Sequence, residues 1–152
     1  DLQIEVHSQK CPLLNKLKDK MNRKISQADL DATTRYDLHT RLEGMPKHTK
    51  LCHGDFNPSN IIITDDGKAY IIAWSHATQG NASADVAKTY LLLSLKRPQY
   101  ADMYLQKYCQ KTGPSKKDVQ QWLPIVAAAQ LDRGIESEKE FLMRWLDVVE
   151  YD

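Results

Sequence analysis

The polar side chains between residues 53 and 60 are the ones whose types and spacing could do chemistry. The stretch reads His53-Gly54-Asp55-Phe56-Asn57-Pro58-Ser59-Asn60. A carboxylate such as that of Asp55 can orient a hydroxyl group and accept its proton. The amide oxygen of Asn60 can bind Mg²⁺, which prefers oxygen ligands. A single loop could therefore hold a base and a metal ligand together.

The spacing of Asp55 and Asn60 matches the H-x-D-x-x-x-x-N pattern of kinase catalytic loops. Phosphoryl transfer asks a protein mainly for positioning and for neutralisation of charge. In this interpretation Asp55 is the catalytic base and Asn60 holds a metal ion. We expect His53 to brace the loop by hydrogen bonding, and Asn57 to reach the transferred phosphate or the acceptor. Ordinary turn chemistry is the alternative for such a run.

Two short apolar segments directly after this loop predict a β-hairpin. Residues 61–64 and 69–73 would be its strands, with Asp66-Gly67 in the turn. Because both strands are apolar on both faces, we expect both to be covered. Residues 74–81 read as a loop, in which His76 either makes a structural hydrogen bond or approaches the site.

The rest of the chain predicts helices, because apolar residues recur at helical spacing. The expected helices cover residues 12–25, 27–43, 83–96, 99–111, about 115–133 and about 137–149. Their expected starts are Pro12, Ser26 with Asp29, Asp85, Ser115 with Asp118, and Ser137 with Glu140. Pro124 should kink or split the fifth helix. Residues 1–10 are either an extended lead-in or the tail of a helix, and the fold class is mainly α with a small β-hairpin (α+β).

Length, charge and cysteine content limit the functional classes. A chain of 152 residues fits one domain, and its net charge of +1 gives no reason to expect nucleic acid or an anionic membrane as a partner. No apolar run approaches the roughly 20 residues that span a bilayer. Cys11, Cys52 and Cys109 fit reduced thiols in a cytoplasmic protein. We interpret the lysines of residues 12–25 as a solvated helix face.

Residues 53–62 resemble the catalytic-loop signature of the aminoglycoside phosphotransferase and choline kinase-like family of small-molecule kinases. A second resemblance to the family follows further along the chain, in the family's next block. It is carried by Ile71-Ile72-Ala73-Trp74-Ser75-His76-Ala77, Gly80 and Asp85-Val86-Ala87. The resemblance implies a protein-kinase-like C-terminal lobe, with ATP or GTP and Mg²⁺ as cofactors. It implies an acceptor hydroxyl on a small molecule, such as an aminoglycoside or a choline-like substrate.

The resemblance also assigns roles to single residues. It implies that Ile62 and Ile72 floor an adenine pocket, although both could simply be core, and that Asp85 braces the catalytic loop. The family places a metal-binding Asp where this chain has Ala73, which offers no side-chain oxygen. An engineered substitution, a natural pseudoenzyme and an aberrant copy would each explain Ala73. Acidic residues often face cationic substrates in this family; we expect the available ones to be solvated at the surface, namely Asp132, Glu136 and Glu138.

Nothing upstream of residue 53 resembles the N-terminal lobe of such a kinase, with its Gly-rich loop and phosphate-gripping Lys. We therefore expect residues 1–152 to be a single domain, the C-terminal lobe, with the N-terminal nucleotide-binding lobe absent. On this ground, and because of Ala73, the chain by itself should be inactive. The alternative is a non-catalytic pseudokinase-like binding module. A hydrolase using His53 and Asp55 ranks last, because no nucleophile motif such as G-x-S-x-G is present.

Overall fold

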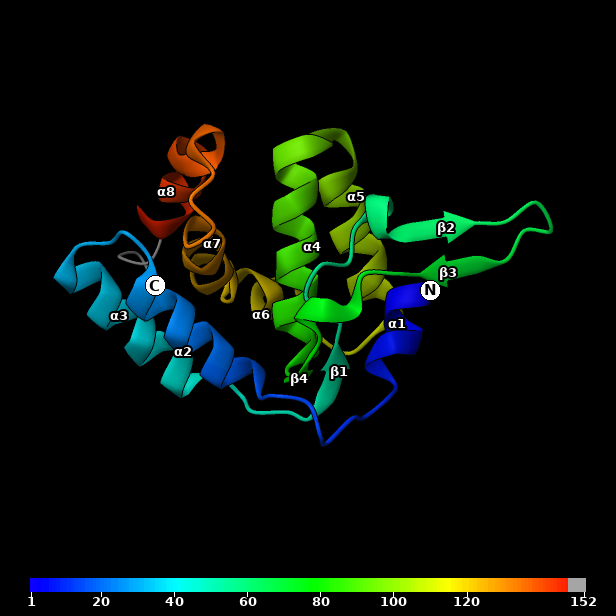
Figure 1. Cartoon of the computed structure of the whole chain (residues 1–152), viewed down its shortest axis with the longest axis horizontal. Coiled ribbons are helices and arrows are strands. Elements are labelled where there is room, and N and C mark those ends of the chain that lie inside the picture. Colours follow the sequence, from blue (N-terminus) through cyan, green and yellow to red (C-terminus); the bar gives the residue numbers. More distant parts are fainter. Residues whose placement is uncertain (148–152) are drawn as a thin grey trace.

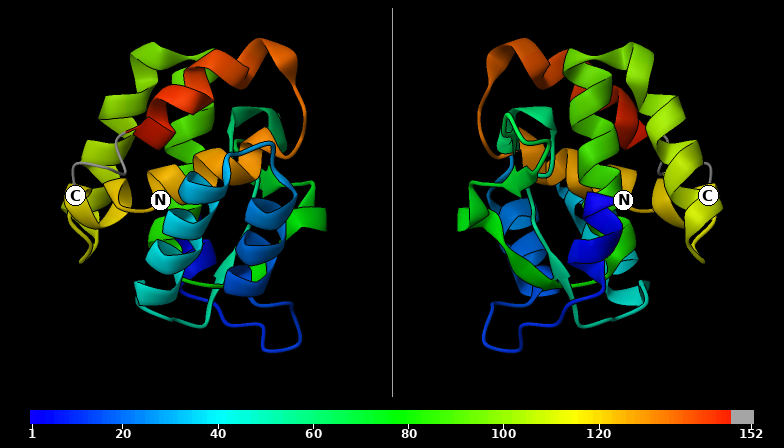
Figure 2. Two further views of the ribbon diagram at one scale, coloured as in Figure 1. Left: turned by 90° about the vertical axis from the view of Figure 1, so that its left-hand side faces the viewer. Right: turned by 90° about the vertical axis from the view of Figure 1, so that its right-hand side faces the viewer.

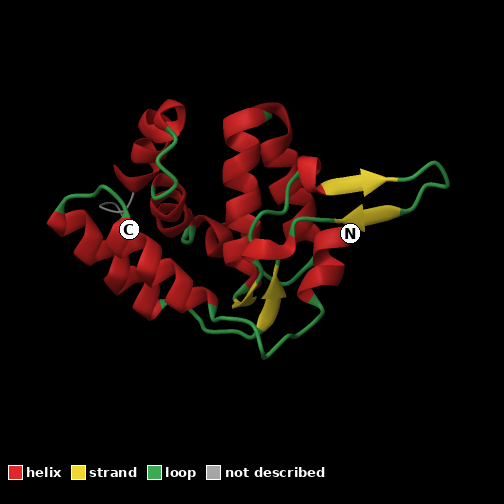
Figure 3. Ribbon diagram, viewed as in Figure 1, coloured by secondary structure: helices red, strands yellow, loops and turns green. Residues whose placement is uncertain are grey.

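The computed structural model describes residues 1–147, which are mainly helical with two antiparallel pairs of short strands (Figures 1 and 3). The helices are α1 (Leu2–His7), α2 (Leu17–Gln27), α3 (Ala32–Gly44), α4 (Ala82–Lys96), α5 (Pro98–Lys111), α6 (Lys116–Gln120), α7 (Leu123–Leu131) and α8 (Lys139–Asp147). The strands are β1 (Lys50–Cys52), β2 (Ile61–Ile63), β3 (Ala69–Ile71) and β4 (Thr78–Gly80). This architecture confirms the predicted fold class. None of the described helices has the length and apolar character needed to cross a membrane.

Helix α4 is the centre of the fold, as its apolar residues on all sides predict. It packs against α5 on one side and α7 on another. Val86, Ala87 and Leu91 of α4 are fully buried, as is Ile125 of α7. Burying a side chain of this size stabilises a fold by about 1.5–3 kcal/mol. The core therefore fixes α4, and with it everything attached to the N-terminus of α4.

The other elements lie on opposite sides of α4. Helices α2 and α3 lie on one side, whereas α1 and the hairpin β2–β3 lie on the other (Figure 1). The two views of Figure 2 look at the molecule from these two sides. The loop of residues 53–60, called the catalytic loop after the signature that it resembles, crosses between them, above the first turn of α4.

Helix α2 starts later than predicted, because β4 takes the backbone groups that precede it. The backbone N–H of Gln79 donates to the Asn15 carbonyl at 3.0 Å, and its side-chain amide donates to the carbonyls of Pro12 and Leu14. A helix from Pro12 would need those carbonyls for itself. The prediction of a helix over 12–25 was therefore wrong at its start, by one turn or more.

The predicted capping box of Ser26 and Asp29 was also wrong. Ser26 lies inside α2, and the extended backbone of Ala28 ends that helix. Asp31 is the N-cap of α3 instead, and its carboxylate accepts a hydrogen bond from the Thr34 N–H at 2.7 Å. The local residue types were suitable for a cap in both places, and packing selected the later one.

Strands β1 and β4 form a sheet where the sequence indicated only linker and loop. Lys50 pairs with Gly80 and Cys52 pairs with Thr78. Each strand has three residues, too few for a recognisable alternation, and the pairing joins segments far apart in the chain. This small sheet holds the start of the catalytic loop against the segment that leads into α4.

The last helices follow the prediction in part. Ser115 and Asp118 form the predicted capping box, and the helix breaks before Pro124, between α6 and α7. The capping box predicted for Ser137 and Glu140 was wrong, because a 3₁₀ turn (Glu136–Glu138) leads directly into α8. Residues 1–10 resolve as α1 followed by a turn. Val149, predicted on the apolar side of the last helix, lies outside the described residues.

The hairpin β2–β3 was predicted correctly in position, but not in its environment. Ile61 pairs with Ile71, and the two strands project from the body (Figure 1). Ile62, Ile63 and Tyr70 are 48%, 64% and 52% exposed, so the expectation that both strands are covered was wrong for this chain. The hairpin therefore carries exposed apolar side chains in the chain as described.

Candidate active site

The catalytic loop is fixed by a buried carboxylate beneath it. Asp85, in the first turn of α4, accepts hydrogen bonds from the backbone N–H groups of His53 and Gly54 at 3.0 and 2.9 Å. Nε2 of His7 lies 2.8 Å from the same carboxylate, and Nδ1 of His7 lies 2.8 Å from the Tyr108 hydroxyl. The brace expected for Asp85 is thus present, and α1 takes part in it.

Burial by itself would raise the pKa of Asp85. The hydrogen bond and charge of His7, together with the N–H groups of Gly54 and His53, outweigh burial and lower that pKa. A lowered pKa in the folded state means that ionised Asp85 stabilises the fold at neutral pH, and that this contribution is lost as the pH falls through the folded-state pKa. The loop is therefore held most firmly when Asp85 is charged.

Replacing Asp85 with alanine should lower the free energy of unfolding by about 3 kcal/mol, because it leaves two buried loop N–H groups and His7 without their acceptor. Denaturant unfolding measures this loss. Asp102→Ala, at an exposed position on α5, should change stability by about 0.5 kcal/mol or less. Similar effects of the two substitutions would show that Asp85 is not a brace.

His53 is fully buried and both of its ring nitrogens are occupied. Nε2 lies 2.9 Å from the Ile72 carbonyl oxygen, and Nδ1 accepts from the Asp55 N–H at 3.1 Å. The ring thereby joins the catalytic loop to the segment after β3. This is the bracing that the sequence indicated, and it leaves neither nitrogen for direct chemistry.

Asp55 is held by two amide groups. Asn57 donates from Nδ2 to one carboxylate oxygen at 2.9 Å, and Asn60 donates from Nδ2 to the other at 3.1 Å. Asn57 therefore orients Asp55, whereas the sequence had assigned it to the phosphate or the acceptor. Its own oxygen accepts from the Ser59 N–H at 3.0 Å. The side-chain nitrogen of Asn60 also donates to the Asp55 carbonyl at 2.8 Å, and its amide oxygen accepts no hydrogen bond from a described residue.

Ala73 adopts a left-handed backbone conformation, with φ 61° and ψ 61°. That region is unfavourable for alanine and is tolerated best by Gly, Asn and Asp. The turn is held on both sides, by His53 at the Ile72 carbonyl and by the Trp74 indole N–H, which donates to the Ile71 carbonyl at 2.9 Å. The backbone at residue 73 thus has the shape that suits an Asp side chain.

Ala73 is also adjacent to Asn60, because the Ile72 N–H donates to the Asn60 carbonyl at 2.9 Å. A magnesium site here would need side-chain oxygens from both positions. Asn60 supplies one, and Ala73 supplies none. The residues present therefore do not complete the site that the resemblance implies, and only the Asn60 half of it fits.

Ala73→Gly should raise the free energy of unfolding by about 0.5–1 kcal/mol, because glycine adopts a left-handed conformation without strain. The matched control is Ala77→Gly, four residues on, where φ is −62° and ψ is 139°. There glycine only increases the entropy of the unfolded chain, so stability should fall. Thermal unfolding of both variants measures the difference. A loss of stability at residue 73 would contradict the strain argument.

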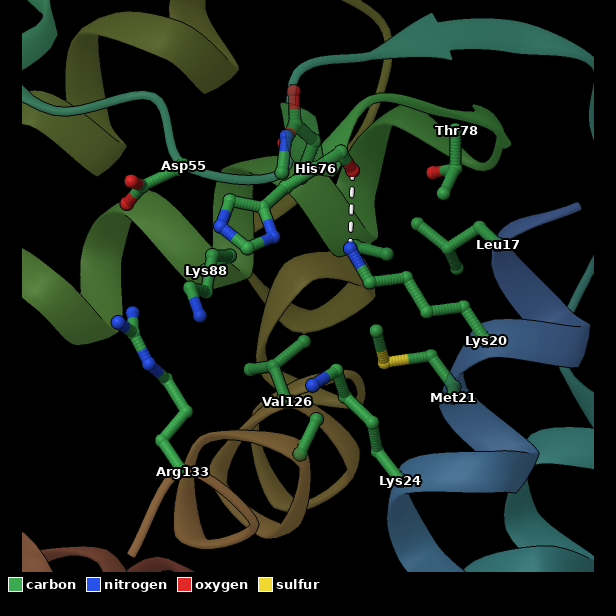
Figure 4. Close-up of a pocket in the computed structure, with 14 residues that line it drawn as sticks. Leu17, Lys20, Met21, Lys24, Asp55, His76, Thr78, Lys88, Val126 and Arg133 are labelled. Atoms are coloured by element: carbon green, nitrogen blue, oxygen red, sulfur yellow. Dashed lines mark hydrogen bonds between the residues drawn. The ribbon is translucent and has the colours of Figure 1, made fainter. Parts of the chain in front are cut away.

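A pocket lies below Asp55, between α2, α4 and α7 (Figure 4). The cavity itself has a volume of about 80 Å³, and the atom-free space around it, including the open mouth, is about 670 Å³. Asp55 and His76 line its upper side. The His76 ring makes no hydrogen bond with any described residue and lines the pocket, so of the two alternatives for it the structure shows the approach to the site. Its carbonyl accepts from Lys20 Nζ at 3.0 Å.

The pocket contains cationic side chains that sequence reasoning missed. They are Lys20 and Lys24 of α2, Lys88 of α4 and Arg133 after α7. The interpretation of the α2 lysines as a solvated face was therefore wrong for two of them. Lys20 and Lys24 are one helical turn apart, which predicts that both lie on the same face of α2. This spacing does not show whether that face meets solvent or a pocket.

The acidic residues considered for a cationic substrate lie elsewhere. Asp132 contacts Lys24, with 3.7 Å between the carboxylate and Nζ, and does not line the pocket. Glu138 is buried and accepts from the Gln130 amide at 2.9 Å, so its expected solvation was wrong. Glu136 is exposed, as expected. None of the three lies in the pocket below Asp55.

Several solved structures that resemble this chain are small-molecule kinases. Choline kinase LicA from Streptococcus pneumoniae superposes with a TM-score of 0.69 at 16% identity, covering 99% of this chain and 61% of its own. Amicoumacin kinase hAmiN, in complex with AMP-PNP, Ca²⁺ and Ami, gives 0.66 at 10% identity, covering 98% and 55%. A thermostable mutant of aminoglycoside phosphotransferase APH(4)-Ia gives 0.58 at 17% identity, covering 88% and 52%.

LicA has also been solved in complex with AMP, and the hAmiN complex contains AMP-PNP and Ca²⁺. Structures of such relatives thus contain nucleotides and a divalent cation. This chain spans between about half and three-fifths of the length of these relatives. No curated protein matches the sequence. The profile of the Phosphotransferase enzyme family (APH) matches residues 5–121, which is more than half of the chain. The chain therefore belongs to the phosphotransferase enzyme family.

Proposed function

We propose that the protein containing this chain transfers the γ-phosphate of ATP, or of GTP, to a hydroxyl group of a small molecule. The observation that carries this proposal is the Asp55 carboxylate, held by two amides at the edge of a pocket. Kinase catalytic loops place an aspartate in this way beside the attacking hydroxyl. Family membership supports the reaction class, and the geometry supports the residue.

In the proposed reaction, Asp55 orients the acceptor hydroxyl and accepts its proton. The hydroxyl oxygen forms a bond to the γ-phosphorus as the bond to the β–γ bridging oxygen breaks, and the nucleoside diphosphate leaves. Asn57 and Asn60 keep the carboxylate in place by their hydrogen bonds. Asp85 and His53 act on the backbone, and so position Asp55 without touching the substrate.

We further propose that the hairpin is the docking surface of a nucleotide-binding lobe. Ile62 and Ile72 are 48% and 39% exposed, and would lie against the adenine in the complete protein. Their exposure supports this assignment, because packed core positions would be covered. The chain alone lacks that lobe and the carboxylate at residue 73, so we expect residues 1–152 by themselves to be inactive.

A non-catalytic binding module is the second candidate, and Ala73 is the observation that favours it. Asp55 with its two amide partners favours the enzyme, because a module without catalysis does not need an oriented carboxylate. The hydrolase alternative loses its support, since both nitrogens of His53 are hydrogen-bonded and the ring is buried.

The experiment is Mg²⁺-dependent ATP consumption by a protein that joins this chain to a nucleotide-binding lobe, against a panel of small alcohols and aminoglycosides. Nucleotide binding is measured in parallel by calorimetry. Turnover of any acceptor supports the enzyme. A protein that binds no nucleotide under any of these conditions contradicts the enzyme and supports the non-catalytic module.

A further inference from the structure

The pocket below Asp55 is positively charged, although the chain as a whole is nearly neutral, with a net charge of +1. Among the described residues, four cationic side chains line it against two carboxylates, those of Asp55 and Asp85. Asp85 is turned toward His7 and the loop N–H groups, so it is already engaged. Figure 4 shows the charged ends of Lys24, Lys88 and Arg133 pointing into the space below Asp55 and His76.

Most of this positive charge has no anionic partner. Lys20 Nζ donates to a backbone carbonyl, and Lys88 Nζ donates to the side-chain oxygen of Gln130 at 2.6 Å. Within residues 1–147, neither of these lysines nor Arg133 forms an ion pair, and only Lys24 has a carboxylate, that of Asp132, 3.7 Å away. Lys20 and Lys88 are half-buried, whereas Arg133 is exposed. Half-buried cations without counter-charges are costly, which indicates that an anion completes the group when a ligand binds.

The pKa of Lys88 is lowered to about 8, chiefly by burial. The charge of Asp55 opposes this lowering, and the charges of Arg133, Lys20 and Lys24 contribute to it. The same mutual repulsion contributes to the lowered pKa of Lys20, in which burial is again the first cause. A cluster of cations that depress one another's protonation is relieved by a bound anion.

A further observation comes from the wall of the pocket. The Thr78 hydroxyl is buried, at 3% exposure, and has no hydrogen-bond partner among the described residues. Thr78 lines this pocket from β4. Buried hydroxyl groups are nearly always paired, so this orphan marks an unusual place in the pocket wall. Because its oxygen has almost no accessible surface, a ligand does not reach it in this structure, and the case for a ligand rests on the cations.

We propose that the acceptor bound here is an anionic polyol, a small molecule that presents a hydroxyl group to Asp55 and a phosphate or carboxylate group to Lys20, Lys88 and Arg133. The inference rests on the proposed function and names its substrate class. The positive charge of the pocket disfavours aminoglycosides and choline as acceptors, because these molecules are themselves cations. Residues of α2, α4 and α7 line the pocket, and no residue of the hairpin does. Helix α2 lies on the opposite side of α4 from the hairpin (Figure 1), which favours a place for the charges at the acceptor.

Binding to the 152-residue chain tests the proposal without requiring turnover. Calorimetry at low salt would compare D-glucose 6-phosphate and D-gluconate with neutral D-glucitol and with the cations choline and D-glucosamine. We expect the two anionic polyols to bind about tenfold or more tightly than the others, as expected for a charge-assisted contact. Equal binding of all probes, tighter binding of the cations, or no binding by any probe overturns the proposal.

Tripolyphosphate distinguishes the other source of the same chemistry, the phosphates of the nucleotide. If tripolyphosphate binds and the two anionic polyols do not, the cations serve the nucleotide and the proposal is wrong. Phosphate transfer is not measured in these titrations. Failure of transfer in a protein that still binds nucleotide would therefore contradict the proposed function, while the anion selectivity stands or falls on its own.

The control variant loses the same charge from the same helix as the Lys20 variant. Lys20→Gln and Lys88→Met should each weaken binding of the anionic polyols by roughly ten- to hundredfold, and Lys88→Arg should keep most of it. Lys18→Gln is the control on α2, because Lys18 pairs with Glu43 at 2.6 Å outside the pocket, and it should leave affinity unchanged. Equal effects of Lys18→Gln and Lys20→Gln would overturn the assignment. Circular dichroism verifies that each variant is folded.

Proton uptake on binding is a further measurement. It distinguishes an anion bound next to Lys88 from nonspecific screening of the pocket's charge. At about pH 8.5 Lys88 is partly neutral, and a bound anion should draw a proton onto it, so the binding enthalpy should depend on the ionisation enthalpy of the buffer. The groups that face Lys88 are Lys20, Lys24, Asp55, His76, Asp85 and Arg133. The dependence should disappear in Lys88→Met, and its persistence there would assign the proton to another of these groups and overturn the role of Lys88.

Discussion

In a protein that joins this chain to a nucleotide-binding lobe, Ala73→Asp should raise the rate of phosphate transfer by roughly 10²–10³-fold. The reason is that the substitution supplies the carboxylate oxygen that the site lacks, next to the Asn60 oxygen. The left-handed backbone at residue 73 accepts an aspartate, so the side chain needs no rearrangement of the turn. Steady-state transfer at saturating Mg²⁺ and ATP measures the change.

The control for this prediction is Ala73→Asn, which fits the same backbone and offers an oxygen without the negative charge. It should recover only a small part of the rate, since Mg²⁺ prefers carboxylates for its protein ligands. A titration with Mg²⁺ should show tighter activation in Ala73→Asp than in either other form. Equal rates for Ala73 and Ala73→Asp would show that residue 73 is no ligand, and would favour the non-catalytic module.

In that activated form, Asp55→Asn should lower kcat by about 10³-fold, because the amide can orient a hydroxyl but cannot accept its proton. The change is isosteric, but the new amide has one oxygen and therefore accepts from only one of the two amide groups of Asn57 and Asn60. Nucleotide affinity should stay close to that of the parent, and the melting temperature should fall by a few degrees at most, because the lost hydrogen bond is worth about 1 kcal/mol. Transfer kinetics, calorimetry and thermal unfolding separate these effects.

Asp65→Asn is the matched control, because Asp65 is an exposed carboxylate in the hairpin turn and lies outside the pocket. It should leave kcat unchanged. A small effect of Asp55→Asn on kcat, with a large effect on KM, would show that Asp55 binds the acceptor and is not its base. Loss of folding in Asp55→Asn but not in Asp65→Asn would assign Asp55 a bracing role instead.

The contrast between Asp85→Ala and Asp55→Asn separates positioning from chemistry. Asp85 is fully buried under the loop and touches backbone N–H groups, whereas Asp55 lines the pocket. The first substitution should act mainly on stability and the second mainly on rate. Sequence comparison within the family motif implied both roles, and the hydrogen bonds explain why the two carboxylates differ.

Several features of the fold could be predicted because they depend on neighbours in the chain. The hairpin follows from two apolar segments around Asp66-Gly67, α4 from apolar residues on all sides, and the break before Pro124 from the missing N–H of proline. The loop of Asp55, Asn57 and Asn60 also belongs to this class, since its hydrogen bonds join residues at most five positions apart. Local spacing was enough to indicate its chemistry.

Other features were decided by contacts between distant segments. The start of α2 depends on Gln79 of β4, and the sheet of β1 and β4 joins strands too short to show a pattern. The exposure of the hairpin depends on what packs against it, which apolar residues alone do not reveal. In each case the local sequence allowed two structures, and tertiary hydrogen bonding or packing selected one.

The sequence by itself determined the loop of residues 53–60, because a candidate catalytic base and the side chains that orient it can be encoded within eight consecutive residues. Only the tertiary structure decided the charge of the pocket beside it. Lys20, Lys88 and Arg133 come from three separate segments, and each is an ordinary cation in its own context. Electrostatic energy depends on distance in space and on burial, so the positive pocket exists only after α2, α4 and α7 have packed around Asp55.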